Sequence, residues 1–329
     1  MRLRGRLAAL VIAALVTGSC ATRPPDPATF SFALMGDQQY NPYEEAVFPQ
    51  MLDAISAEPL AFVVHVGDFK AGSFSPCTDK LYLRRREEFN QSKHAFILTP
   101  GDNDWIDCRR NNNGHADPFE RLAKIREIFF ADNRSLGKEP ITVLRQSEVH
   151  AADPVLARYR ENALWKYGGL VFATFNIQGG NDNFGHDAVS DAEHAERTRA
   201  NIAWLKFAAA EASHEGMLGL AIFLQANPGF EEPVAKVNSS GFAEFLRAFE
   251  REAKALRKPV LFAHGDTHQY RVQHPYLNPL DRQPIANVTR VETHGSPFTN
   301  WVRITVIPRD AANPFTIKPG GFSPAVKSD

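Results

Sequence analysis

Three aspartates in the first third of the chain each follow a glycine at the end of a short apolar run. They are Asp37, Asp68 and Asp102, preceded by Gly36, Gly67 and Gly101. A single Gly-Asp pair is a common turn dipeptide, but three pairs in this position form a pattern. Carboxylates that converge on one crevice repel one another unless a cation lies among them. The pattern therefore indicates a site for a divalent metal.

Two later apolar runs also end in polar residues. One leads into Gln225, and the other leads into His264-Gly265-Asp266-Thr267-His268. In an open α/β sheet the functional site lies beyond the carboxyl ends of the strands. We therefore expect Gln225, Asp266 and His268 to join the aspartates. Taken alone, each has a simpler explanation as a polar side chain that is satisfied by hydrogen bonds.

These corners require strands and helices to position them. Short runs rich in β-branched and aromatic residues predict buried strands. They cover residues 30–35, 62–66, 95–98, 218–224 and 260–263. Apolar residues at spacings of three and four predict helices over 43–56, 118–130, 191–212 and 240–256. Asp117 and Pro118 suit the cap and the first turn of the second helix. In the tail, residues 288–293 and 301–307 alternate in polarity and predict an antiparallel hairpin.

The alternation of strands and helices indicates an α/β protein with a largely parallel sheet. With 329 residues and 43% hydrophobic composition, the chain can bury a large core. We see no internal repeat and expect a single domain over residues 30–329. The net charge of −1 argues against specific nucleic-acid binding, which needs a basic excess.

The N-terminus has the composition of a signal sequence over residues 1–21. Three arginines precede an apolar run over residues 7–16, which is too short to span a bilayer as a helix. Two modes of cleavage fit: an ordinary signal peptidase site, or cleavage before Cys20 followed by lipidation of that cysteine. A Pro-rich tether over residues 22–29 follows. We expect an exported protein of the bacterial periplasm, or a lipoprotein attached to the outer membrane, with no transmembrane helix in its mature form.

The other two of the three cysteines are Cys77 and Cys108. Two cysteines in the mature part of an exported protein usually pair. A bridge between them would close a loop of roughly 30 residues, worth roughly 3–4 kcal/mol in the chain-entropy model. It would also tie together the loops that follow Asp68 and Asp102. The alternative is a free buried thiol at each position.

The order of these blocks resembles that of the calcineurin-like metallophosphoesterases. That family uses Asp-x-His, Gly-Asp, Gly-Asn-His-Asp/Glu, a lone His and Gly-His-x-His. The corresponding blocks here are Asp37-Gln38-Gln39, Gly67-Asp68, Gly101-Asp102-Asn103-Asp104, Gln225 and Gly265-Asp266-Thr267-His268. The resemblance covers roughly residues 30–310. It implies a four-layer αββα sandwich with mixed sheets, two divalent metal ions, and hydrolysis of a small phosphorylated substrate by a metal-activated water.

The metal ligands that this resemblance implies are rich in oxygen. They are Asp37, Gln39 and His268 at one metal, Asp102, Gln225 and Asp266 at the other, and Asp68 as the bridge. Gln39, Gln225 and Asp266 stand where the family has histidines. Oxygen ligands suit Mg²⁺, Mn²⁺ or Ca²⁺ better than Zn²⁺ or iron.

Asn103 stands where the family has the histidine that protonates the leaving group. Asp104 and His264 are the candidate replacements for this acid, and Asn103 itself could hold the phosphate or cap the turn. Lys70, Arg271 and Arg290 could neutralise a phosphate or a nearby carboxylate. Two functions therefore stay open: an exported phosphoester hydrolase, and a catalytically inactive binding protein of the cell envelope with the same fold. No Gly-x-Ser-x-Gly follows any predicted strand, which argues against a serine hydrolase.

Overall fold

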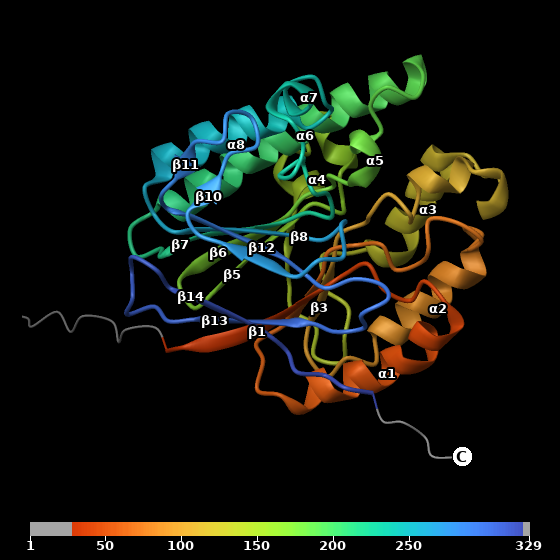
Figure 1. The fold of residues 1–329 in the computed structure, drawn as a ribbon, viewed down its shortest axis with the longest axis horizontal. Coiled ribbons are helices and arrows are strands. Elements are labelled where there is room, and N and C mark those ends of the chain that lie inside the picture. The colour runs from red at the N-terminus through yellow and green to blue at the C-terminus, as the bar shows by residue number, and fades with distance from the viewer. Residues whose placement is uncertain (1–27, 325–329) are drawn as a thin grey trace, which may run out of the picture.

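The computed structural model describes residues 28–324. The helices and strands of this part of the chain form four layers. Two β-sheets stack face to face, and helices cover their outer faces (Figure 1). Helices α6 (Ala188–Ser213) and α8 (Ala243–Leu256) lie on one side, and α1 (Pro42–Ala57) and α2 (Asp79–Phe89) lie on the other. The predicted αββα sandwich with mixed sheets is confirmed.

The first sheet has five strands in the order β14-β13-β1-β2-β3. Their bounds are Phe30–Met35 for β1, Val63–His65 for β2, Phe96–Leu98 for β3, Val302–Val306 for β13 and Phe315–Pro319 for β14. Strands β1, β2 and β3 run parallel, whereas β13 is antiparallel to β1 and β14 is antiparallel to β13. Because β1, β2 and β3 end at the same edge, the three Gly-Asp corners are neighbours.

The second sheet has seven strands in the order β4-β5-β6-β7-β8-β12-β9. Their bounds are Leu144–Arg145 for β4, Ala163–Tyr167 for β5, Leu170–Thr174 for β6, Gly219–Phe223 for β7, Val260–His264 for β8, Arg271–Gln273 for β9 and Val288–Glu292 for β12. Strands β6, β7, β8 and β12 are parallel and end at one edge. A separate pair joins β10 (Tyr276–Leu277) to β11 (Pro284–Ile285).

Polar caps begin the main helices. The Asn41 side chain accepts the Glu44 N–H at the start of α1, and Asp117 accepts the Phe119 N–H at the start of α3 (Pro118–Phe129). Each bond satisfies an N–H that has no partner within the helix. Three shorter elements labelled as helices are α4 (Gln146–Val149), α5 (Gly179–Asp182) and α7 (Val234–Asn238). Short 3₁₀ turns lie at η1 (Ile106–Arg109), η2 (Asn111–Asn113) and η3 (Leu156–Arg158).

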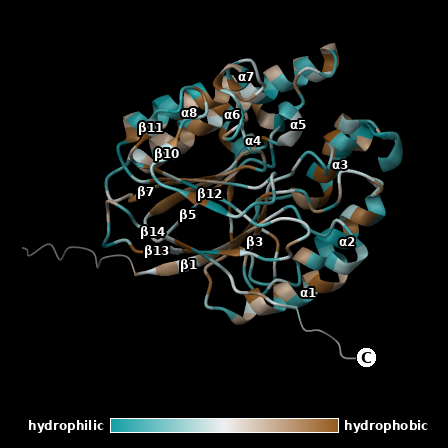
Figure 2. Cartoon of the chain, viewed as in Figure 1, coloured by the Kyte–Doolittle hydropathy of each residue, from teal (hydrophilic) through white to brown (hydrophobic). Residues whose placement is uncertain are grey.

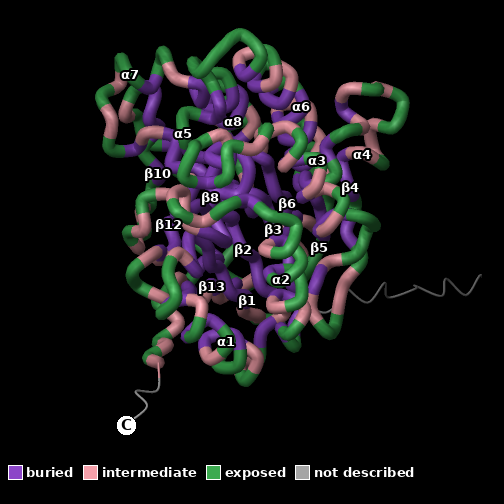
Figure 3. The backbone as a smooth tube through the Cα atoms, turned by 90° about the vertical axis from the view of Figure 1, so that its right-hand side faces the viewer, coloured by how far each residue is buried: buried purple, intermediate pink, exposed green. Residues whose placement is uncertain are grey.

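Aromatic side chains fill the space between the two sheets. The ring centroids of Phe32 in β1 and Phe62, which directly precedes β2, lie 5.0 Å apart, and Phe62 lies 5.0 Å from Phe172 of the second sheet. The strands are the most hydrophobic part of the chain (Figure 2) and the central elements are buried (Figure 3). Because a close-packed core deforms little, it fixes the edges of the two sheets relative to each other.

The predicted hairpin of the tail is wrong. Strand β12 pairs with β8 and β9 in the second sheet, whereas β13 pairs with β1 and β14 in the first sheet. All five residues of β12 are buried, so the strand is covered on both faces despite its alternating sequence. The turn around Gly295 therefore carries the chain from one sheet to the other instead of folding it back.

The predicted disulfide is confirmed. Cys77 and Cys108 are bonded, with their Cα atoms 5.6 Å apart. Both cysteines are buried beneath the first sheet, among Tyr82, Trp105 and Leu122. The bridge thus joins the loop after β2 to the loop after β3.

The signal sequence, Cys20 and most of the tether lie outside the described residues, so those predictions stay predictions. Between residues 28 and 324, no helix combines the length and the apolar character needed to cross a membrane.

Candidate functional site

The strand ends of both sheets meet around the side chain of Gln225. Its amide nitrogen, Nε2, donates to Asp37 Oδ1 at 3.3 Å and to Asp68 Oδ2 at 3.1 Å. The backbone N–H of Asp266 also donates to Asp37 Oδ1, at 3.0 Å. Residues that follow β1, β2, β7 and β8 therefore lie within hydrogen-bonding distance of one another.

Several residues of these corners have a left-handed backbone. Positive φ angles occur at Asp37 (53°), Gln39 (67°), Asp68 (57°), Asp266 (86°) and His268 (62°). This region is uncommon for residues other than glycine and costs of order 1–3 kcal/mol for each residue. Such strain persists only where the surrounding structure imposes it, and it clusters at functional sites. Five of the seven predicted ligands therefore have this left-handed backbone.

Asp68 accepts hydrogen bonds from three directions. Besides Gln225, the backbone N–H of Asn103 donates to Oδ1 at 3.0 Å, and the hydroxyl of Tyr40 donates to Oδ2 at 3.0 Å. The Asn103 amide donates in turn to the Tyr40 hydroxyl at 2.9 Å. Sequence reasoning missed Tyr40, whose only signal is its position next to Gln39.

His268 presents one ring nitrogen to the carboxylates. Its Nδ1 lies 2.7 Å from the carbonyl oxygen of Ser296, which can only accept, so Nδ1 carries the proton. The lone pair is then on Nε2, which lies 3.8 Å from Asp37 Oδ1. A histidine held in this way is oriented as metal-binding histidines are. Its side chain remains 28% exposed, so the site is open on this side.

Asp102 and Asp266 approach each other across Gly179. A Cβ at position 179 would lie 2.6 Å from Asp102 Oδ1 and 2.8 Å from Asp266 Oδ1, so only glycine fits there without a shift. The backbone N–H of Gly179 donates to Gln225 Oε1 at 2.6 Å. Gly179 follows β6. The sequence did not predict its role, because that role depends on how closely Asp102 and Asp266 approach it in the folded chain.

Asp104 faces the backbone of its own and the neighbouring corner. Its carboxylate accepts the N–H groups of Gly101, Asp68 and Phe69 at 2.8, 2.9 and 3.0 Å. Lys70 strengthens the same junction, since its buried ammonium group donates to the carbonyl oxygens of Ala71 and Asn103, both at 2.7 Å. These contacts hold the second and third corners together and engage both oxygens of Asp104.

His264 also lies within the framework. Its Nδ1 lies 2.8 Å from the Gly265 carbonyl oxygen, and Nε2 accepts from the Arg290 guanidinium at 2.9 Å. Burial, together with the positive charge of Arg290, lowers the pKa of His264 well below its usual value. With both ring nitrogens engaged, His264 is placed to hold Arg290 rather than to deliver a proton.

Gln39 is turned towards α2. Its amide nitrogen donates to Glu88 Oε2 at 2.9 Å, and Arg85 of the same helix bonds to Glu88 as well. Its amide oxygen is buried and has no hydrogen-bond partner among the described residues. The amide nitrogen of Gln39 is therefore directed out of the carboxylate cluster.

Burial dominates the electrostatics of the cluster. It raises the pKa of Asp37, Asp68, Asp102 and Asp266, the last to about 7. Repulsion from neighbouring carboxylates raises the pKa of Asp37, Asp68 and Asp266 further. Both effects disfavour the charged carboxylates, and both are relieved by a bound cation.

Two carboxylate oxygens in the cluster provide a test of whether a cation fits. Asp37 Oδ2 and Asp102 Oδ1 are buried and accept no hydrogen bond from the described residues. Such an oxygen needs a proton or a cation as its partner. Carboxylates with one imidazole suit Mg²⁺ or Mn²⁺, which keep water molecules as their other ligands. The donor set therefore fits a divalent cation.

Both oxygens of Asp68 and Oδ1 of Asp37 already accept hydrogen bonds from the protein. Gln225, Tyr40 and the Asn103 N–H donate to Asp68, and Gln225 and the Asp266 N–H donate to Asp37. Within residues 28–324, no three His, Cys, Asp or Glu side chains are preassembled in metal-binding geometry. A cation at this site would consequently replace some of the amide and hydroxyl donors.

A cavity of about 440 Å³ adjoins the cluster at Asp266. Its walls include Gly179, Asn181, Pro228, Val237 and Phe242. A volume of this size accommodates a small organic molecule.

Comparison with known proteins identifies the fold but not the family. No family model and no curated protein matches the chain. Among solved structures, PhoD superposes with a TM-score of 0.54 at 13% identity, over 88% of this chain and 68% of PhoD. A dimetal phosphatase from Danio rerio gives a TM-score of 0.44 at 10% identity, over 84% of this chain and 92% of the phosphatase. The chain therefore shares the four-layer fold of PhoD.

Proposed function

We propose that the protein is a metal-dependent phosphoester hydrolase. One observation carries this proposal: Asp37, Asp68, Asp102, Asp266 and His268 gather at the strand ends of both sheets, with two buried carboxylate oxygens left without a partner. When bound, a divalent cation at such a site polarises a phosphoryl oxygen and lowers the pKa of a bound water.

The side chains divide into those that would hold the cation and those that position them. Asp37, Asp68 and His268 supply two carboxylates and a free imidazole nitrogen. Asn103 and Tyr40 hold Asp68 in place through its two oxygens. The Asn103 amide has two N–H bonds, of which one goes to Tyr40 and the other is available to a phosphoryl oxygen.

The adjoining cavity would hold the organic part of a small phosphorylated substrate. It borders Asp266, and its walls at Pro228, Val237 and Phe242 are apolar. Burial of an apolar group there would favour binding by roughly 25 cal/mol for each Å² removed from water.

Hydrolysis of generic phosphate esters tests the proposal. We expect turnover of a monoester or a diester on addition of Mn²⁺, Mg²⁺ or Ca²⁺. Asp68→Asn should lower the rate by about 100-fold or more, because the substitution removes a negatively charged ligand of the cation. Asp53→Asn, at an exposed position on α1, is the matched control and should leave the rate unchanged. Activity that survives Asp68→Asn would contradict the proposal.

The second candidate is a catalytically inactive binding protein with the same fold. It is favoured by the engaged state of Asp104 and His264 and by the amide at Asn103, which cannot protonate a leaving group. A bound metal without turnover of any ester would establish this function instead.

Export from the cytoplasm is also a proposal. The signal-like composition of residues 1–21 supports it, as does the disulfide, since such bonds persist in oxidising compartments. The mass of the mature N-terminus would distinguish a lipidated Cys20 from ordinary cleavage, and an uncleaved chain would exclude both.

A further inference from the structure

We propose that Gln225 limits this site to one divalent cation, which Asp37, Asp68 and His268 hold. Gln225 does so by presenting amide N–H bonds, instead of a ligand atom, to the cluster. The inference rests on the proposed function only in requiring that a cation binds. It departs from the two cations that the sequence led us to expect.

The orientation of the Gln225 amide follows from its partners. Its oxygen accepts the Gly179 N–H at 2.6 Å, and its nitrogen donates to Asp37 and Asp68. A rotated amide would set N–H against the Gly179 N–H, and oxygen against two carboxylates. The protons of an amide nitrogen point outward, and the group has no lone pair to offer a cation. Gln225 therefore serves as a donor to the cluster.

Gly179 is itself held by an unusual turn. The backbone after it is left-handed at Gly180 (φ 60°), Asn181 (58°), Asp182 (56°) and Asn183 (63°). A run of such residues is costly away from glycine, so other contacts must impose it. The turn places the Gly179 N–H against Gln225 and the Gly179 Cα between Asp102 and Asp266.

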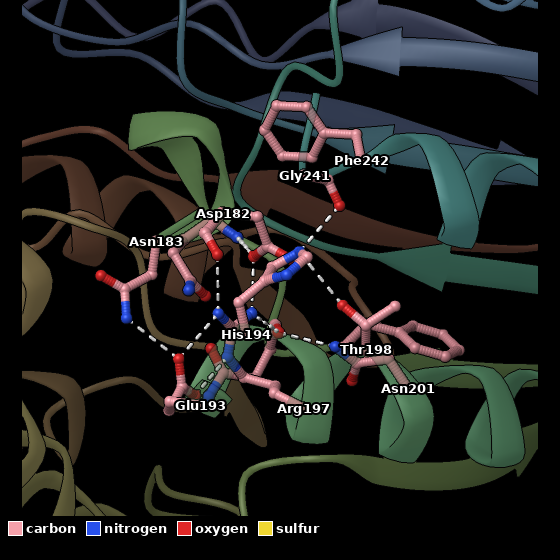
Figure 4. Close-up of polar contacts among 12 residues, drawn as sticks. Asp182, Asn183, Glu193, His194, Arg197, Thr198, Asn201, Gly241 and Phe242 are labelled. Atoms are coloured by element: carbon pink, nitrogen blue, oxygen red, sulfur yellow. Dashed lines mark hydrogen bonds and ion pairs between the residues drawn. The ribbon is translucent and has the colours of Figure 1, made fainter. Parts of the chain in front are cut away.

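Helix α6 supplies those contacts (Figure 4). The fully buried Arg197 donates to Asp182 Oδ1 at 2.5 Å and to the Asp182 carbonyl oxygen at 2.9 Å. Glu193 accepts from both Arg197 and Asn183, at 2.7 and 3.0 Å. His194 lies 3.5 Å from Asp182 Oδ2 and 2.9 Å from the Gly241 carbonyl oxygen. A buried network thus presets the turn, and through it the Gln225 amide.

The two halves of the cluster differ in what they offer a cation. On one side Asp37 has an unpartnered oxygen, and His268 has a free lone pair 3.8 Å from the other oxygen. On the other side Asp102 also has an unpartnered oxygen and Asp266 accepts the Asn227 N–H, but no histidine nitrogen of residues 28–324 lies within 4.0 Å of either carboxylate. Two carboxylates, one imidazole and water complete a single Mg²⁺ or Mn²⁺ site. A second cation would have to share Asp68 with the first, and it would meet the N–H that Gln225 directs at Asp68 Oδ2.

Metal counting tests the inference without any assay of activity. Equilibrium dialysis of the full chain against Mn²⁺, followed by elemental analysis, should give one Mn²⁺ for each wild-type chain. Gln225→Glu should bind two, because one carboxylate oxygen keeps the Gly179 bond and the other replaces the N–H group. Gln225→His should also bind two. Gln283→Glu, at an exposed position, adds the same charge and should still bind one.

Two Mn²⁺ on the wild type would overturn the inference and leave the proposed hydrolase intact. A wild-type chain that binds no Mn²⁺ would overturn both the inference and the proposed hydrolase. If Gln225→Glu or Gln225→His keeps its circular dichroism spectrum and still binds one Mn²⁺, the role proposed for Gln225 is overturned. Electron paramagnetic resonance adds a second measurement, because isolated Mn²⁺ gives a resolved six-line signal and a coupled pair a broadened one. If Gln225→Glu does not fold, Gln225→His and the wild-type count decide.

Discussion

Asp68 is the residue on which the most contacts of the cluster converge. It accepts from the side chains of Tyr40 and Gln225 and from the backbone of Asn103. Tyr40 is the member of this group with no counterpart in the sequence pattern. Its hydroxyl links Asp68 to Asn103. The contribution of that hydroxyl can be measured by itself, since removing it changes neither charge nor the ring.

Tyr40→Phe should therefore destabilise the protein. The substitution removes one donor to Asp68 and one acceptor from Asn103, and bonds to charged or buried groups contribute about 1–3 kcal/mol. Urea denaturation in the presence of a chelator should show a loss of this size. Tyr43→Phe is the matched control, because Tyr43 is 61% exposed and three residues away. Equal stability of the two variants would show that the Tyr40 hydroxyl contributes nothing.

At the scale of elements, α6 and the left-handed turn act as one unit. Arg197 is the main link between them, since it contacts both the side chain and the backbone of Asp182. Removing one partner of a buried ion pair leaves an uncompensated charge, which costs about 3–5 kcal/mol. The turn is thus maintained by a helix that contributes no side chain to the carboxylate cluster.

We expect Arg197→Met to lower the free energy of unfolding by about 3–5 kcal/mol. Arg199→Met, two residues further along α6, should change it by less than about 1 kcal/mol, because Arg199 is 58% exposed and its ion pair is on the surface. Denaturant unfolding of both variants checks the difference. A loss that is the same in both would contradict a specific role for the Asp182 pair.

The sequence predicted the elements that carry a strong periodic pattern. Strands β1, β2, β3, β7 and β8 and helices α1, α3, α6 and α8 lie within a few residues of their expected bounds. Helix α2 was not expected, because seven of the eleven residues in Asp79–Phe89 are charged and only three are buried. The pairing of β12 and β13 depends on strands that are distant in the sequence, so the local sequence pattern does not predict it.

In the candidate site, the sequence predicts which residues come together but not how their side chains are oriented. Residues at strand ends were found because parallel strands bring their ends together, and the structure places Asp37, Asp68, Gln225 and Asp266 in contact. The orientation of a side chain was not predictable. Whether Gln225 offers oxygen or nitrogen depends on Gly179, which lies 46 residues away in the chain. The ligand and acid roles of the predicted residues remain predictions.

For the whole molecule, the buried carboxylates make stability depend on pH. The pKa of Asp266 is raised to about 7, from an ordinary value near 4 in the unfolded chain. The folded state therefore holds this proton more tightly. The stabilising contribution is complete below pH ~4 and is lost as the pH rises through about 7. Buried histidines with lowered pKa values, such as His264, act in the opposite direction.

A comparison with Asp266→Asn isolates this effect, because the asparagine cannot ionise and the histidines are common to both proteins. With a chelator present, the melting temperature of the wild type should fall relative to the variant between pH 5 and pH 8. We expect a change of several degrees, since each pKa unit corresponds to about 1.4 kcal/mol and each kcal/mol to about 2–4 °C. A melting temperature of the wild type that rises relative to that of the variant over this pH range would contradict the raised pKa of Asp266.

The position of β1 has a consequence for how the molecule is assembled. This strand lies inside the first sheet, between β2 and β13. One of its edges stays unpaired until the last part of the chain has been synthesised, and an unpaired edge is a template for aggregation. That edge of β1 is covered only once β13 pairs with it. Because Asp266 and His268 also come late, the site forms only when the chain closes on its own beginning.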